Sequence, residues 1–328
     1  MERARVVVTL SPTAELSAVF SGVLDPLAEV VVLRDAEPGA RRELLSSADA
    51  LLAWSVAGEL GDDELAALGS ARLLQLLSAG VDHVPFERIP PSLPVASNAG
   101  SYSEPMAEHV LALTLALAKH LPQRHADLAA WVFDQATPNR SLRDSTVVIL
   151  GYGGIGQASA RLFRSFGSRV AAIGRSPGPP GEVDEHGSLD DLDAFLPRAD
   201  VLVIALPLTR ATRGLIGGRE LSLMKEDAIL VNVARAAIVD EDALYEHLRS
   251  HPGFSAGLDV WWQEPRRRDP FTTRHPLLDL PNVLGSPHNS ALTPTSLADS
   301  AREAAENVAR ALRDEPVHHL VDRAEYLG

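Results

Sequence analysis

Three polar residues, Arg235, Glu264 and His288, have the side chains needed for hydride transfer between a nicotinamide and a carbonyl group. An imidazole gives and takes a proton near neutral pH, so His288 suits the carbonyl oxygen. A carboxylate touching that imidazole favours its charged form and fixes its orientation, which is the role expected for Glu264. The Arg235 guanidinium suits a substrate carboxylate and the polarised carbonyl. Taken singly, each residue also fits a structural role, as an ion pair, a turn residue or a packing residue.

A glycine-rich segment indicates where the cofactor binds. Gly151-Tyr152-Gly153-Gly154-Ile155-Gly156 follows an apolar run at 146–150 and opens a helical pattern at 155–166, the context of a dinucleotide fingerprint. Gly151 permits the tight turn, Gly153 lets the backbone approach a pyrophosphate, and Gly156 lets the helix pack closely on the sheet. The phosphates then face the helix N-terminus.

The residues after the next expected strand, 169–173, bear on the choice of cofactor. An acidic residue at Gly174 would hydrogen-bond the 2'-hydroxyl of NAD and repel a 2'-phosphate, but the chain continues with Arg175-Ser176. A guanidinium and a hydroxyl suit the charge and geometry of a phosphate. We therefore expect NADP(H) as the preferred cofactor and NAD(H) as the second choice. The alternative is that Arg175 only solvates the strand end.

Apolar runs alternate with helical patterns along the chain. Runs lie at 6–10, 30–33, 50–53, 73–77, 201–206, 228–233, 254–258 and 283–285, and helical patterns near 14–23, 41–47 and 62–68. This alternation indicates parallel sheets in two successive α/β units. Ligands bind at the carboxyl ends of such strands, where Arg235, Glu264 and His288 fall.

Two longer helices are also expected. One covers 103–121, with Ser103 as a cap and an apolar surface almost all round, so it must be buried on several sides. The other is capped by Thr293 and runs to about 312. Its domain membership does not follow from periodicity.

Size and composition limit the function classes. A chain of 328 residues favours two domains, and its net charge of -14 argues against nucleic acid or an anionic membrane as the partner. An anionic substrate then needs a local positive site. The absence of cysteine excludes disulfides and thiolate chemistry, and no metal ion is expected. The apolar runs are too short for a signal sequence or a membrane span, so we expect an untargeted cytoplasmic protein.

The ordered set of motifs resembles the D-isomer-specific 2-hydroxyacid dehydrogenases. After the fingerprint come Leu206-Pro207-Leu208-Thr209-x-x-Thr212, Asn232-Val233-Ala234-Arg235, Gly257-Leu258-Asp259-Val260 with Glu264-Pro265, and Pro287-His288. Upstream, Ser78-Ala79-Gly80-Val81-Asp82-His83 is similar to the family's substrate-carboxylate loop. Asn98-Ala99-Gly100, followed by Ala107-Glu108-His109, is similar to its inter-domain segment. The resemblance covers nearly the whole chain.

The resemblance implies a role for each matching position. Arg235, Glu264 and His288 would form the catalytic trio. The amides of Ala79 and Gly80 would help to bind the substrate carboxylate. The remaining cofactor contacts would come from Leu206, Pro207, Thr212, Val233, Ala234 and, at the nicotinamide amide, Asp259. We expect Trp54 and Tyr102 to line the pocket for the substrate side chain.

The resemblance also implies the architecture: two Rossmann-like, doubly wound parallel-sheet domains. A flavodoxin-like substrate domain would comprise 1–98 and 289–328, and the dinucleotide-binding domain 99–288, with a cleft that closes over substrate. The helix region at Met106 would carry the contact of a homodimer.

Two departures from the family pattern carry information. Ala236 replaces a common glycine, a change that is tolerated unless its φ is positive. Asn289-Ser290 resembles the formate dehydrogenase branch, but that branch has Gln where this chain has the ionisable Glu264. We therefore predict NADPH-preferring reduction of small 2-oxo acids to D-2-hydroxy acids. The alternatives are a formate- or phosphite-type dehydrogenase and a non-catalytic, dinucleotide-gated sensor.

Overall fold

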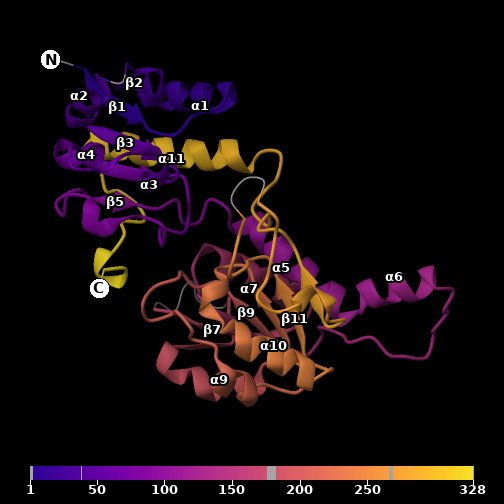
Figure 1. The fold of residues 1–328 in the computed structure, drawn as a ribbon. Helices are drawn as coiled ribbons and strands as arrows, with labels where there is room; N and C mark the ends of the chain where they lie inside the picture. Colours follow the sequence, from indigo (N-terminus) through magenta and orange to yellow (C-terminus); the bar gives the residue numbers. More distant parts are fainter. Residues whose placement is uncertain (1–2, 38, 176–181, 266–268, 328) are drawn as a thin grey trace. The chain divides into compact units, whose positions relative to one another are not determined.

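The computed structural model describes residues 3–37, 39–175, 182–265 and 269–327 (Figure 1). Their contacts divide the chain into two compact units, which we describe separately. The first unit combines Met1–Tyr102 with Leu292–Gly328, so the chain leaves it once and returns. The second unit is Ser103–Ala291. Each unit contains one parallel sheet, which confirms the expected α/β class.

The sheet of the first unit has five strands in the order β2-β1-β3-β4-β5. Its strands are β1 (Ala4–Val8), β2 (Ala28–Val32), β3 (Ala50–Ala53), β4 (Leu73–Leu76) and β5 (Val95–Ala96). Every pairing between them is parallel. This is the flavodoxin-like order, and the strands are apolar because helices cover both faces of such a sheet.

Two apolar clusters fill the two faces of this first sheet. The helices are α1 (Ala14–Leu24), α2 (Arg41–Ser46), α3 (Val56–Glu59), α4 (Asp62–Leu65) and α11 (Ser296–Leu312). Thr13 caps α1, because its side chain accepts a hydrogen bond from the Leu16 amide. The returning helix α11 packs on α1 and buries small residues such as Ala304 and Ala305 against the sheet. The last long helix therefore belongs to the first unit.

The sheet of the second unit has seven strands in the order β12-β11-β10-β9-β6-β7-β8. Its strands are β6 (Thr146–Leu150), β7 (Arg169–Ile173), β8 (Glu185–Gly187), β9 (Val201–Ile204), β10 (Ile229–Asn232), β11 (Ser255–Leu258) and β12 (Val283–Gly285). All neighbours are parallel, so all carboxyl ends lie at one edge. Strand order reverses at β6, and such switch points bind dinucleotides.

The helices of the second unit include the buried helix expected near Met106. They are α5 (Ser103–Ala118), α6 (Leu121–Ala129), α7 (Gly154–Ser165), α8 (Leu192–Phe195), α9 (Gly218–Leu223) and α10 (Glu241–Ser250). Helix α5 packs on α7, β10 and β11, while α6 projects from the second unit (Figure 1). In the part of the chain that the structure describes, no helix is long and apolar enough to cross a membrane.

Three expected helix boundaries were wrong. The helix expected over 103–121 ends at Ala118, because His120 has φ +50° and a new helix, α6, starts at Leu121 with Pro122 in its first turn. The segment 62–68 is one short α-helix followed by a separate 3₁₀ turn at Leu68–Ser70. The last helix begins at Ser296, although the Thr293 hydroxyl does accept a hydrogen bond from the Ser296 amide at 3.1 Å. Backbone conformation and capping decide where these helices begin and end, and the spacing of apolar residues in the sequence does not reveal either.

Candidate active site

His288 and Glu264 form a direct pair beyond the carboxyl ends of β12 and β11. Nδ1 of His288 lies 2.8 Å from both Glu264 carboxylate oxygens. A carboxylate only accepts hydrogen bonds, so Nδ1 carries the proton and Nε2 is the nitrogen that can face a substrate. The amide of Trp261 donates to Glu264 at 3.3 Å. The two side chains are 38% and 40% exposed, so solvent and small molecules reach the pair.

Glu264 is held in its charged form. Burial raises the pKa of Glu264, but the hydrogen bond from His288 and the positive charges of His288 and Arg235 outweigh burial, so the pKa lies below its usual value. All three side chains of the expected trio belong to the second unit.

The turn after β10 presents Arg235. The buried Asn232 side chain spans this turn, accepting from the Ala234 amide at 3.0 Å and donating to the Arg235 carbonyl at 2.9 Å. The guanidinium donates to the Ala234 carbonyl at 2.8 Å. Ala236 begins a 3₁₀ turn and is not among the residues with positive φ, so the departure from glycine is accommodated.

Asp259 is fully buried, and its carboxylate serves the segment around His288. One oxygen accepts from the Ser286 hydroxyl at 2.6 Å and from the Asn289 amide at 3.1 Å. The other oxygen accepts from the Ser290 amide at 3.1 Å. These contacts give Asp259 a role inside the chain, while its contact with a nicotinamide amide stays a prediction.

The glycine turn has the backbone geometry of a dinucleotide fingerprint. Gly151 has φ +102°, and a β-carbon there would lie 2.5 Å from the Ala205 carbonyl. A β-carbon on Gly156 would collide with the Gly151 carbonyl oxygen. At Gly153, by contrast, an added β-carbon would meet no heavy atom of the described residues within 4 Å. Within the described residues, no side chain caps the start of α7, so its first amides can bind an anion. The open space at Gly153 therefore fits a pyrophosphate.

Tyr152 lies beside the end of β7. A β-carbon on Gly174 would lie 3.1 Å from the Tyr152 β-carbon, so the fingerprint and this strand end touch. The Tyr152 hydroxyl donates to Glu182 at 3.3 Å. Burial and the charge of Glu182 raise the pKa of Tyr152 to about 12, so the phenol is neutral at physiological pH. The sequence did not single out Glu182, because the loop before it carries no periodic signal.

Arg175 lies two residues after the carboxyl end of β7, next to Gly174, and it is exposed. Its expected partner Ser176 lies outside the described residues. The position expected to carry an acidic residue in an NAD-specific protein is Gly174, whose amide donates to the Gly187 carbonyl on β8.

The other expected cofactor residues follow β9 and β10 at the same sheet edge. The buried Thr212 closes the loop after β9, because its hydroxyl donates to the Pro207 carbonyl at 2.7 Å and accepts from the Thr209 amide at 2.8 Å. Leu206 and Pro207 lie in this loop, and Val233 and Ala234 follow β10. Their contacts with a cofactor stay predictions.

The expected substrate residues belong to the first unit. Ala79 and Gly80 lie in the loop after β4, where the Ser78 hydroxyl donates to the Gly80 carbonyl at 2.9 Å. Trp54 directly follows β3 and is 40% exposed. His83, at the end of the β4 loop, is hydrogen-bonded through Nε2 to the Trp54 carbonyl at 3.1 Å. The two loops therefore meet at one edge of the first sheet.

Glu59, which sequence reasoning did not single out, organises the Trp54 loop. Its carboxylate accepts from the amides of Trp54 and Ser55 and, at 2.6 Å, from the Thr9 hydroxyl. Tyr102 lies elsewhere in the unit: its buried hydroxyl donates to the Leu77 carbonyl at 3.0 Å and contacts Ser300. These bonds give the Tyr102 hydroxyl a structural role, and its expected contact with substrate stays a prediction.

Comparisons with known proteins agree with this geometry. Residues 111–290 match the model of the NAD-binding domain of D-isomer specific 2-hydroxyacid dehydrogenases. A glyoxylate reductase of Aeropyrum pernix is 33% identical, with 98% of this chain and 97% of the relative covered. The solved NADPH-dependent glyoxylate/hydroxypyruvate reductase of Sinorhizobium meliloti, in complex with NADP and sulfate, superimposes with a TM-score of 0.82 at 26% identity. That alignment covers 99% of this chain and 100% of the other.

A D-3-phosphoglycerate dehydrogenase of Methanocaldococcus jannaschii is also similar, at 31% identity over 92% of this chain. The match spans only 56% of the length of that relative. The family model, the curated relatives and the solved structure point to the same family, as do the fingerprint geometry and the His288–Glu264 pair. The chain belongs to the D-isomer specific 2-hydroxyacid dehydrogenases.

Proposed function

We propose that the protein is an NADPH-preferring reductase that converts small 2-oxo acids into D-2-hydroxy acids. The observation that carries the proposal is the bonded pair of His288 and Glu264 at the carboxyl edge of a sheet whose glycine turn fits a dinucleotide. The similarity to enzymes named glyoxylate reductase and NADPH-dependent glyoxylate/hydroxypyruvate reductase supports this substrate class and this cofactor.

The residues of the chain supply binding and proton transfer. A bound reduced nicotinamide supplies the hydride, which adds to the carbonyl carbon with both electrons of the new C–H bond. Protonated His288 then gives the proton on Nε2 to the carbonyl oxygen, while Glu264 holds Nδ1 and balances the positive charge of the ring. Arg235 binds the substrate carboxylate and draws electron density from the carbonyl. The products are the hydroxy acid and the oxidised nicotinamide.

The chain also offers groups for recognition. We propose that the amides of Ala79 and Gly80 bind the substrate carboxylate and that the exposed ring of Trp54 contacts its side chain. The ionised Glu264 beside His288 favours reduction at a carbonyl, which consumes a proton. Oxidation of formate needs no proton transfer to a substrate oxygen, so this pair argues against formate as the substrate.

The test is a substrate panel with each cofactor. Oxidation of NADPH and NADH is followed by absorbance with glyoxylate, hydroxypyruvate, pyruvate, 3-phosphohydroxypyruvate and a branched 2-oxo acid. We expect turnover with NADPH, and a loss of about 100- to 10,000-fold in His288→Ala with NADPH affinity retained, because the imidazole acts on substrate. Absence of turnover despite demonstrated cofactor binding would contradict the proposal. Oxidation of formate or phosphite by the same preparation would identify the alternative.

A further inference from the structure

The backbone of His288 adopts an unusual conformation. Its φ is +51°, in the left-handed region that a residue with a β-carbon rarely occupies. Such a conformation persists only where the surroundings impose it, and it is found preferentially at functional sites. The backbone conformation of His288 sets the direction of its imidazole. The contacts that impose the left-handed conformation therefore also determine where Nε2 points.

The Asp259 carboxylate restrains the chain on both sides of His288. It accepts from the two amides that follow, Asn289 and Ser290, each at 3.1 Å. It also accepts from the hydroxyl of Ser286, two residues before, at 2.6 Å. A change of the His288 backbone would break these bonds and leave a fully buried carboxylate without its donors, which is unfavourable.

His109, on helix α5, completes this arrangement. Its Nε2 lies 2.8 Å from the Ser286 hydroxyl oxygen and 3.7 Å from an oxygen of Asp259. Ser286 has a single hydroxyl proton, which it donates to the carboxylate, so it accepts from His109 and Nε2 of His109 carries a proton. The direction of every hydrogen bond in the series His109, Ser286, Asp259 is therefore fixed.

We propose that His109 is a positioning residue for the proton donor: acting through Ser286 and Asp259, it holds His288 in the left-handed conformation that aims Nε2 at the substrate. His109 fixes the rotation of the Ser286 hydroxyl group. It also places the positive end of its N–H dipole beside the buried Asp259 carboxylate. This inference rests on the proposed function, because it assigns His109 an effect on the His288 proton transfer, and it adds a residue of α5 to the determinants of that step.

The experiment compares four variants with the wild type. His109→Leu and Ser286→Ala remove the hydrogen bonds, and His109→Gln keeps a side-chain N–H that can reach Ser286. Thr114→Val is the matched control, because it removes another buried side-chain hydrogen bond of α5, to the Val110 carbonyl. The measurements are kcat, KM, NADPH dissociation by fluorescence, the solvent deuterium isotope effect on kcat and the melting temperature.

We expect His109→Leu to lower kcat by up to about 100-fold, the effect of a small misplacement of a reacting group. NADPH affinity should stay close to that of the wild type, and the solvent isotope effect should rise because proton transfer becomes slower. Ser286→Ala should behave alike, His109→Gln should recover most of the rate, and Thr114→Val should leave kcat unchanged. An unchanged kcat and isotope effect in folded His109→Leu would overturn the proposal. An equal loss in Thr114→Val would also overturn it.

Failure of the proposed function is recognised separately, by the absence of 2-oxo acid turnover in the wild type. A crystal structure of His109→Leu then decides the inference without an assay. A His288 backbone that leaves the positive-φ region supports the positioning role, and an unchanged backbone overturns it.

Discussion

His288 presents Nδ1 to both oxygens of Glu264, so its orientation and its charge are coupled to one carboxylate. The pKa of Glu264 is lowered in the folded protein, so its carboxylate is ionised above the usual carboxylate range and becomes protonated only as pH falls through the lowered pKa. At neutral pH the carboxylate is therefore available to balance an imidazolium. This agrees with the proposed direction of reaction, in which His288 begins protonated.

Arg175 provides the prediction at the residue scale. If its guanidinium binds the 2'-phosphate, Arg175→Ala should weaken NADPH by about tenfold or more and NADH far less, because a charge-assisted hydrogen bond contributes about 1.5–3 kcal/mol. Dissociation constants from nicotinamide fluorescence measure this effect. Arg198→Ala, which removes an exposed arginine paired with Glu185, is the control. Equal losses for both cofactors in Arg175→Ala would show that the phosphate assignment is wrong.

Glu182 is a second charged residue that affects the choice between NADPH and NADH. Its carboxylate is held by the Tyr152 hydroxyl at 3.3 Å and by Arg161 at 3.8 Å, on the side of the fingerprint that faces Gly174. A carboxylate near this strand end opposes a 2'-phosphate, whereas Arg175 favours it. The ratio of the two dissociation constants shows which charge dominates.

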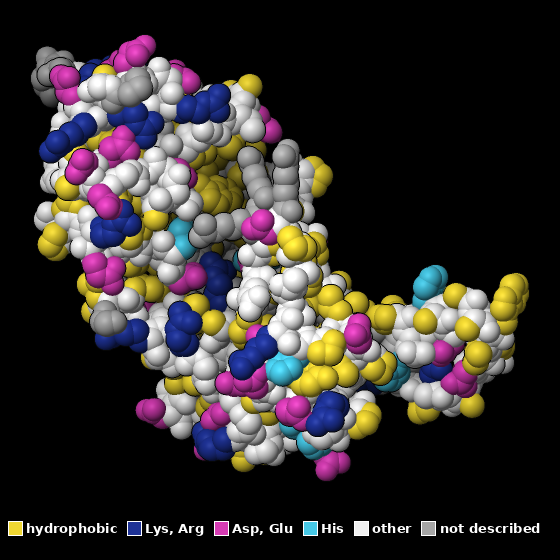
Figure 2. Space-filling model, viewed as in Figure 1, with side chains coloured by type: hydrophobic (Ala, Val, Ile, Leu, Met, Phe, Trp, Pro, Cys, Tyr) yellow, Lys and Arg dark blue, Asp and Glu magenta, His cyan; other side chains and the backbone are white. Residues whose placement is uncertain are grey.

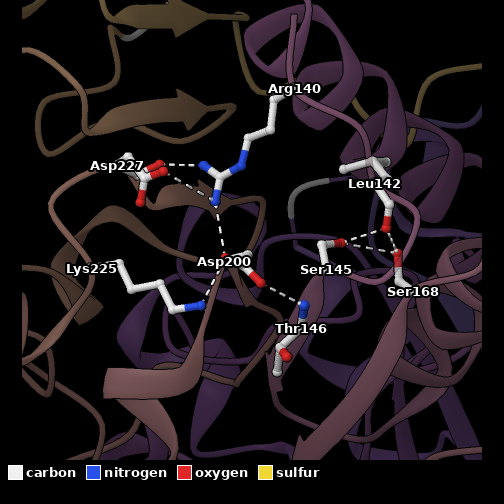
Figure 3. Close-up of polar contacts among 8 residues, drawn as sticks. All are labelled: Arg140, Leu142, Ser145, Thr146, Ser168, Asp200, Lys225 and Asp227. Carbon is white, nitrogen blue, oxygen red and sulfur yellow. Dashed lines mark hydrogen bonds and ion pairs between the residues drawn. The ribbon is translucent and has the colours of Figure 1, made fainter.

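At the scale of elements, a charged network joins β6 and β9 at their amino ends, opposite the edge that carries the candidate site. Figure 3 shows Asp200 at its centre. Asp200 accepts from the Thr146 amide at 2.7 Å, from Lys225 at 2.8 Å and from Arg140 at 3.1 Å. Arg140 also donates to the carbonyl of Asp227. The network ties the chain that returns from α6 to the sheet.

Asp200→Asn is the prediction at this scale. Burial raises the pKa of Asp200, but the hydrogen bonds from Lys225 and Thr146 and the charges of Lys225 and Arg140 outweigh it, so the pKa lies below its ordinary value of 3.8. At neutral pH the variant should lose about 1–3 kcal/mol of unfolding free energy, because a charged acceptor is removed from three donors. Urea denaturation measures the loss.

The pH dependence of that loss follows from the sign of the shift. The contribution of Asp200 is fully present above pH 3.8 and is lost as pH falls through the lower folded pKa, so the variant and the wild type should converge in acid. Asp227→Asn is the control, because the side chain of Asp227 is 68% exposed and its carbonyl, not its carboxylate, carries the shorter contact with Arg140. A difference that persists unchanged into acid would contradict this account.

At the scale of the whole molecule, the segment 121–133, which contains α6, exposes large apolar side chains to solvent. Figure 2 shows apolar side chains gathered over this projecting segment. The exposed residues are Leu121, Leu128, Trp131, Val132 and Phe133, and Trp131 is 96% exposed. Contiguous apolar surface of this kind is rare on monomers and marks interaction sites. We therefore expect a second copy of the chain to cover it. This places the homodimer contact in the segment after α5, whereas the family resemblance implies a contact at the helix region of Met106.

The double variant Trp131→Ser/Phe133→Ser tests this assembly. Removing two aromatic anchors should shift the protein from dimer to monomer in analytical ultracentrifugation, because such residues dominate interface energies. Leu292→Ser, which removes an apolar side chain that is 72% exposed outside this segment, should leave the mass unchanged. A wild-type protein that sediments as a monomer would refute the homodimer.

The sequence alone was sufficient where local chemistry decides the structure. The strands expected at 50–53, 169–173 and 283–285 have those bounds, because strands of a parallel sheet are largely continuous apolar runs, even where a strand such as β12 is only partly buried. The fingerprint turn was predictable for a similar reason: only glycine accepts φ +102° at Gly151 and the close approach at Gly156. The three-residue strand β8 escaped prediction, because Glu185–Gly187 has no apolar run and depends on pairing with β7.

Tertiary structure alone decided which distant residues meet. Type and position predicted that Glu264 would pair with His288, but the left-handed backbone of His288 and the Asp259 bonds around it appear only in the fold. His109 reaches Ser286 across 177 positions, and no periodicity encodes such a contact. Strand order and the packing of α5 bring these residues together. These features depend on many residues at once, so no local pattern in the sequence encodes them.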